Sequence, residues 1–126
     1  MEKNKKKILV IEDEATLQKA LGEIFLRENY EVLSALDGAR GLELAKNEKP
    51  DLVLLDLILP KLDGFGVLNE LKNKEETKGI PVIILTNLGE TTDVQKAIEL
   101  GATTYLIKSD YQLDEVVKKV EEILQS

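Results

Sequence analysis

One carboxylate stands in the middle of a run of apolar residues. Residues 52–55 are Leu-Val-Leu-Leu, Asp56 follows them, and residues 57–59 are again apolar. A run of this kind is typical of a strand that is buried on both faces inside a parallel sheet. Because a charge is unfavourable to desolvate, Asp56 is either a strand-end residue that faces solvent or part of a functional site. The residues that the fold places beside Asp56 decide between these two interpretations.

Polar residues also end three of the other strands that we expect, the first, the fourth and the fifth. Those that could act on a charged ligand are Glu12, Asp13, Thr86 and Lys108. Ligands of open α/β sheets bind at the carboxyl ends of the strands, near the point where the strand order reverses. Because the carboxyl ends of parallel strands share one edge, we expect all four residues to lie together with Asp56.

This expected cluster has the composition of a site that handles a phosphoryl group. Three carboxylates at one place repel each other, and a hard divalent cation such as Mg²⁺ relieves that repulsion. Lys108 supplies a positive charge, Thr86 supplies a hydroxyl donor, and a carboxylate can act as a nucleophile. Two structural interpretations compete with this one. The first is a carboxylate–lysine ion pair at the edge of the sheet, and the second places acids 12–14 in the first turn of a helix, where they favour its dipole.

The elements that position these residues alternate between strand and helix. We expect strands at residues 8–11, 31–35, 52–56, 82–86 and 104–107. The spacing of apolar residues predicts a helix that ends near residue 29 and further helices at about 39–47, 65–71, 92–100 and 113–124. Alternation with short loops implies a parallel sheet covered by helices on both faces.

Three details refine this arrangement. The fully apolar runs should form the central strands, whereas residues 31–35 include polar residues and should lie at an edge. Gly64, in the loop after the third strand, is free to adopt a positive φ angle. Residues 109–112 match a capping box for the last helix.

Length and composition restrict the function further. The 126 residues fit a single domain, and the net charge of −7 argues against direct binding of nucleic acid. The sequence has no cysteine and no histidine, which excludes thiolate zinc sites, cysteine nucleophiles and a histidine general base. No run approaches the roughly 20 apolar residues of a membrane span, and no signal peptide is visible. We therefore expect a cytoplasmic protein without membrane insertion.

Taken as a set, the polar residues at the strand ends resemble those of the receiver domain of two-component response regulators. The resemblance rests on acids 12–13, Asp56, Thr86 and Lys108 at the ends of successive strands. The turn at residues 59–64 and Tyr105 in the last strand are also similar to that family. The resemblance extends from about residue 6 to residue 124. The combination of these motifs is much more specific than any one of them alone.

The resemblance implies a doubly wound (βα)₅ fold with sheet order 2-1-3-4-5 and one receiver domain over residues 1–126. Asp56 would accept a phosphoryl group from a phosphohistidine. Since this chain has no histidine, the donor would be a sensor histidine kinase or a histidine phosphotransfer protein. Asp13, Asp56 and the main-chain carbonyl of Ile58 would bind Mg²⁺, and Glu12 would assist through a bound water.

The resemblance also implies how the signal would leave the site. Lys108 would contact the phosphoryl oxygens, Thr86 would move to donate a hydrogen bond to them, and Tyr105 would turn inward. The changed surface would be the helix at about 92–100 together with the last strand and helix, and its output partner is unknown. The protein would thus be a phosphorylation-controlled switch and not an enzyme. We expect a stand-alone switch, because the last apolar stripe ends at residue 124. The alternative is a receiver from a longer regulator or hybrid kinase.

Four residues depart from the family pattern. Ser109 replaces the usual proline, and Asn87 replaces a small residue. Ile58 and Leu88 are apolar at the two positions that commonly tune loss of the phosphoryl group. Since neither side chain can orient an attacking water, the hypothesis is a long-lived phosphorylated state.

Two other classes of protein are less favoured. A Mg²⁺-dependent phosphohydrolase with an aspartyl nucleophile usually has a second aspartate two residues later, where this chain has Ile58. A flavodoxin-like FMN carrier needs a loop rich in hydroxyls and glycine after the first strand. Acids 12–14 occupy that place and would repel the phosphate.

Overall fold

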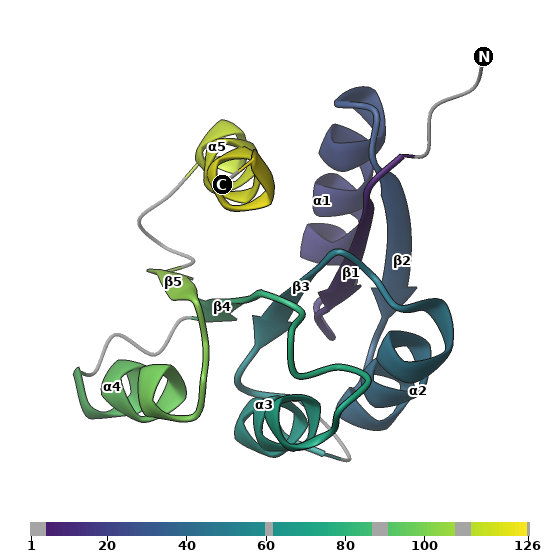
Figure 1. Ribbon diagram of the computed structural model, residues 1–126. Coiled ribbons are helices and arrows are strands. Elements are labelled where there is room, and N and C mark those ends of the chain that lie inside the picture. Colours follow the sequence, from purple (N-terminus) through teal and green to yellow (C-terminus); the bar gives the residue numbers. More distant parts are fainter. Residues whose placement is uncertain (1–4, 60–61, 87–90, 108–111, 126) are drawn as a thin grey trace.

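The computed structural model describes residues 5–59, 62–86, 91–107 and 112–125. Five strands and five helices alternate along these residues (Figure 1). The elements in chain order are β1 (Lys7–Ile11), α1 (Ala15–Arg27), β2 (Glu31–Ala35), α2 (Gly38–Glu48), β3 (Leu52–Asp56), α3 (Gly64–Asn73), β4 (Val82–Thr86), α4 (Thr91–Glu99), β5 (Thr104–Ile107) and α5 (Leu113–Gln125).

The strands form one parallel sheet in the order β2-β1-β3-β4-β5, which confirms the predicted doubly wound topology. The central strands are those whose sequences are apolar throughout, and every residue of β3 is buried. Strand β2 lies at an edge, as its polar residues predicted. The register aligns the carboxyl ends of neighbouring strands, with Ile11 opposite both Ala35 and Leu55 and with Asp56 opposite Leu85.

Helices cover both faces of the sheet. Figure 1 shows α1 and α5 on one face and α2, α3 and α4 on the other. Each layer encloses its own apolar cluster. Phe25 of α1 and Val116 of α5 belong to the first cluster, and Ala45, Leu68 and Ala97 of the other three helices belong to the second. Burial on both faces therefore fixes the central strands, and with them the position of Asp56.

Helix α1 begins later than the helix-dipole interpretation requires. Its first residue is Ala15, and its first turn has no acidic residue. Acids 12 and 13 lie in the turn between β1 and α1, and Glu14 is the residue before the helix. The interpretation of these acids as members of a first helical turn is therefore wrong.

Helix α5 starts at the predicted residue, but its cap differs from the prediction. The helix begins at Leu113, and the main-chain N–H of Gln112 donates to Oε1 of Glu115 at 2.9 Å. This contact is the return half of a capping box whose first residue is Gln112. The cap predicted at residues 109–112 is thus misplaced, and residues 109–111 lie outside the described part of the chain.

Gly64 is required for a different reason from the one predicted. Among the described glycines, Gly101 has a positive φ angle, of 114°, and Gly64 does not. A Cβ atom on Gly64 would instead overlap the main chain of Asp56 and Leu57. The glycine permits close approach of α3 to the end of β3.

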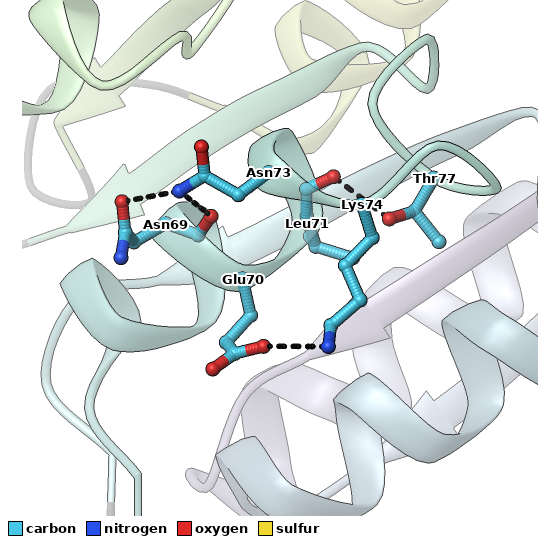
Figure 2. Close-up of polar contacts among 6 residues, drawn as sticks. All are labelled: Asn69, Glu70, Leu71, Asn73, Lys74 and Thr77. Carbon is cyan, nitrogen blue, oxygen red and sulfur yellow. Dashed lines mark hydrogen bonds and ion pairs between the residues drawn. The ribbon is translucent and has the colours of Figure 1, made fainter.

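Figure 2 shows the polar contacts around the C-terminus of α3. Because Lys72 reaches the Ile80 carbonyl, just before β4 begins, this end of α3 lies near the amino end of β4, away from the strand ends just described. The buried Thr77 hydroxyl donates to the Leu71 carbonyl at 2.7 Å, and Asn73 donates to the Asn69 carbonyl at 2.8 Å. Lys72 Nζ donates to the Ile80 carbonyl at 2.6 Å, and burial lowers the pKa of this lysine.

None of the helices in the described part of the chain is long and apolar enough to cross a membrane.

Candidate functional site

Three carboxylates meet at the carboxyl edge of the central strands. Glu12, Asp13 and Asp56 each place one carboxylate oxygen within 4.8 Å of those of the other two. Glu12 is fully buried, Asp56 is 5 % exposed, and Asp13 is exposed. The cluster therefore has a buried base and an open side toward solvent, as a site for an entering ligand requires.

Asp56 is held by the end of β3 and the start of α3. Its Oδ1 accepts a hydrogen bond from the main-chain N–H of Ile58 at 3.2 Å. The N–H of Gly64 donates to the Leu57 carbonyl at 2.9 Å, which brings the first residue of α3 against the loop. Because all of β3 is buried, the carboxylate is presented from a part of the chain with little freedom to move.

Glu12 and Asp13 are held by contacts of the β1–α1 turn. The N–H of Glu12 donates to the Ala35 carbonyl at 3.0 Å and so extends the pairing of β1 with β2 by one residue. The N–H of Glu14 donates to Oε2 of Glu12 at 3.0 Å. These contacts direct the turn back over the edge of the sheet, toward Asp56.

The three carboxylates fit a hard divalent cation. Each supplies oxygen ligands, and Mg²⁺ prefers oxygen and retains several waters, which the exposed side at Asp13 permits. Like charges this close repel, and the partial burial of the site strengthens the repulsion. A cation at this place would offset that repulsion, so the donor set and its charge agree with the predicted Mg²⁺ site.

Of the other predicted site residues, some have a described side chain, one has a described main chain only, and the rest lie outside the described part of the chain. The Ile58 side chain is 58 % exposed, two residues beyond Asp56. Thr86 is the last residue of β4 and pairs with Ile107 of β5, although its side chain is not described. Tyr105, in β5, is 42 % exposed. Lys108, Leu88, Asn87 and Ser109 lie outside the described residues.

Gln18 also belongs to this region, although it was not among the predicted site residues. Its side-chain amide donates to three main-chain carbonyls, including that of Glu12 at 3.1 Å. A signal was present in the sequence. Gln18, Leu21 and Phe25 are spaced as one buried stripe of α1, and an amide at such a position is unusual unless it makes buried hydrogen bonds.

Comparison with known families agrees with this geometry. The model of the response regulator receiver domain family matches residues 8–121, which is most of the chain.

Curated relatives show the same family. The probable transcriptional regulator ycf27 of Cyanophora paradoxa is 44 % identical over 108 residues, which are 86 % of this chain and 44 % of that protein. Sporulation initiation phosphotransferase F of Bacillus subtilis is 37 % identical over 118 residues, which are 94 % of this chain and 93 % of that protein. The chain thus spans less than half the length of the ycf27 relative and nearly the whole length of the Bacillus protein.

Solved structures share the fold over almost the entire chain. A putative response regulator from Chloroflexus aurantiacus superposes with a TM-score of 0.90 at 28 % identity and covers 98 % of this chain and 100 % of its own. The receiver domain of a sensor histidine kinase from Pseudomonas aeruginosa, which has a magnesium ion coordinated in its active site cleft, superposes with a TM-score of 0.88 at 25 % identity, covering 98 % of this chain and 100 % of its own. The family match, the relatives and the shared fold lead to one conclusion: this chain belongs to the response regulator receiver domain family.

Proposed function

We propose that this chain is a phosphorylation-controlled switch in which Asp56 accepts a phosphoryl group from a phosphohistidine. The observation that carries the proposal is the convergence of Glu12, Asp13 and Asp56 within 4.8 Å at the edge of the sheet. Asp56 is the residue best suited as acceptor, because it ends a fully buried strand and remains 5 % exposed at the open side of the site.

In the proposed reaction, a carboxylate oxygen of Asp56 attacks the phosphorus atom. The P–N bond of the phosphohistidine breaks, and its electron pair remains on the imidazole of the donor. Asp13, Asp56 and the main-chain carbonyl of Ile58 would hold Mg²⁺, with Glu12 acting through a bound water. When bound, Mg²⁺ offsets the negative charge of the carboxylates and of the phosphoryl oxygens.

Residues of β4 and β5 would sense the phosphoryl group. Thr86 would donate a hydrogen bond to it, and Lys108 would contact its oxygens. Support comes from the register of the sheet: Thr86 pairs with Ile107, so the chain leaves β5 beside the end of β4. Tyr105 is 42 % exposed in this structure and would turn inward after phosphorylation, which would change the surface formed by α4, β5 and α5.

The proposed partners follow from the chemistry of the chain. The sequence has no histidine, so the donor is a second protein, either a sensor histidine kinase or a histidine phosphotransfer protein. The net charge of −7 favours a protein as the output partner over nucleic acid. The Bacillus relative is named a phosphotransferase, which agrees with a place in a phosphorelay, and the ycf27 relative is named a transcriptional regulator. We place residues 1–126 in one receiver domain that acts in the cytoplasm as a switch and not as an enzyme.

Incubation with Mg²⁺ and a small phosphodonor, such as acetyl phosphate or phosphoramidate, tests this proposal. Intact-mass spectrometry should show addition of one phosphoryl group to the wild-type chain and none to Asp56→Asn. Asp114→Asn, which changes an exposed carboxylate of α5, is the control and should be labelled like the wild type. Full labelling of Asp56→Asn would assign the acceptor to another residue.

A further inference from the structure

The side-chain amide of Gln18 connects three main-chain carbonyls at the base of the acidic cluster. Gln18 Nε2 donates to the carbonyls of Val10, Glu12 and Ala35, each at 3.1 Å. Val10 belongs to β1 and Ala35 to β2, whereas the Glu12 carbonyl lies in the peptide that joins Glu12 to Asp13. One side chain of α1 thus links both strands to the turn that carries two of the three acids.

The contact with the Glu12 carbonyl bears directly on the site. A peptide group is planar, so a hydrogen bond to its carbonyl also restrains the rotation that sets the direction of the next residue. The preceding peptide, between Ile11 and Glu12, is restrained as well, because Glu12 N–H donates to the Ala35 carbonyl, which Gln18 also contacts. The main chain at residues 12 and 13 is therefore fixed by hydrogen bonds that meet at Gln18.

The surroundings of Gln18 show that its donor function is what matters. The side chain is 6 % exposed, and three carbonyls face its nitrogen, so the opposite orientation of the amide would place oxygen against oxygen. Gln18 Oε1 is buried and has no hydrogen-bond partner within the described residues. A buried acceptor without a partner is unfavourable, so the side-chain oxygen does not explain why glutamine stands here. What glutamine adds here is the pair of N–H groups.

We propose that Gln18 is a positioning residue for the divalent cation. By restraining the peptide between Glu12 and Asp13, it keeps their carboxylates within reach of Asp56 and so raises the affinity of the site for Mg²⁺. This inference rests on the proposed function, since it assumes that the three carboxylates bind Mg²⁺. Gln18 does not touch the ion and acts through the main chain of Glu12 and Asp13.

Gln18→Met tests the inference, because methionine has a similar length and no hydrogen-bond donor. Isothermal titration calorimetry with MgCl₂, in the absence of any phosphodonor, should show Mg²⁺ affinity reduced by about tenfold, as for other residues that orient metal ligands. Hydrogen exchange at the amides of residues 12–14 should become faster in the same variant. If Gln18→Met does not fold, Gln18→Asn takes its place, since its amide is one methylene too short to reach all three carbonyls.

Thr77→Val is the matched control. It also removes a buried side-chain donor to a main-chain carbonyl, that of Leu71 (Figure 2). This contact lies near the amino end of β4 and not at the carboxyl ends of the strands. This variant should lose thermal stability and keep the Mg²⁺ affinity of the wild type. Wild-type affinity in the Gln18 variant, or an equal loss of affinity in Thr77→Val, would overturn the inference while leaving the proposed function intact. A wild-type chain that binds no Mg²⁺ would overturn both.

Discussion

Gly64 lies directly against the main chain of Asp56. A Cβ atom at this position would overlap the Asp56 carbonyl and the Cα of Leu57, so only glycine fits. The N–H of Gly64 also donates to the Leu57 carbonyl at 2.9 Å. The first residue of α3 and the last residue of β3 are thus packed backbone to backbone, and the position of Asp56 depends on that contact.

Replacing Gly64 should therefore disturb both stability and function. We expect Gly64→Ala to lower the free energy of unfolding by about 1–3 kcal/mol, the usual effect of overpacking, and to slow phosphorylation by small donors. Urea denaturation measures the first effect. Gly79→Ala is the control, because a Cβ there meets no atom within 4 Å, and it should change stability by less than about 0.5 kcal/mol. Equal effects of the two substitutions would show that the backbone contact is unimportant.

Asp13→Asn should reveal the cation through stability. A ligand that binds only the folded state at about 100 times its Kd stabilises that state by about 2.7 kcal/mol. The wild-type chain should gain this amount from Mg²⁺, whereas Asp13→Asn should gain much less, because it removes one charged ligand of the three. Without Mg²⁺ the variant should be the more stable protein, since it lacks one of three like charges. Thermal unfolding with MgCl₂ or with EDTA measures both effects, and equal Mg²⁺ stabilisation of wild type and variant would exclude Asp13 as a ligand.

Ile58 should govern how long the phosphoryl group remains. Its side chain is 58 % exposed beside Asp56 and has no polar atom with which to orient a water. We expect Ile58→Asn to accelerate loss of the phosphoryl group by at least about tenfold, because the new amide can position the attacking water. The decay is followed by intact-mass spectrometry after removal of the donor. Leu26→Asn, at a residue that is 60 % exposed on α1, should decay like the wild type, and an unchanged rate in Ile58→Asn would reject this role.

Tyr105 should become less accessible after phosphorylation. The sequence has three tyrosines and no tryptophan, so a variant with Phe at positions 30 and 111 reports on Tyr105 alone. We expect acrylamide to quench the fluorescence of this variant less strongly once it is phosphorylated. The same variant with Asp56→Asn should show no change when the donor is added. Quenching that stays constant after complete phosphorylation would mean that Tyr105 does not turn inward.

Much of the architecture could be predicted from the sequence. The strands β2, β3, β4 and β5 have the predicted bounds, because runs of apolar or alternating residues are limited on both sides by turn residues or charges. The convergence of the three acids could be predicted as well, since it follows from a parallel sheet whose carboxyl ends share an edge. The helix bounds were correct to within one or two residues, except at the start of α1.

The remaining features depend on tertiary contacts. The position of Gln18 on a buried stripe is visible in the sequence, but which carbonyls its amide reaches depends on the placement of α1 above β1 and β2. Gly64 could be recognised as a residue with a particular backbone role. However, a close backbone approach and a positive φ angle both require glycine, so the sequence does not distinguish between them. The cap of α5 was misplaced because several residues before the helix are good capping residues, and local sequence does not choose among them.

The central claim is that Asp56 carries the phosphoryl group, and chemical trapping of the acyl phosphate tests it most directly. The chain is phosphorylated with acetyl phosphate and Mg²⁺, reduced with borohydride, digested and analysed by mass spectrometry. Reduction of an aspartyl phosphate leaves homoserine, so the account predicts homoserine at position 56 and unmodified aspartate at position 13. Homoserine at any other aspartate, with Asp56 intact, would contradict the account.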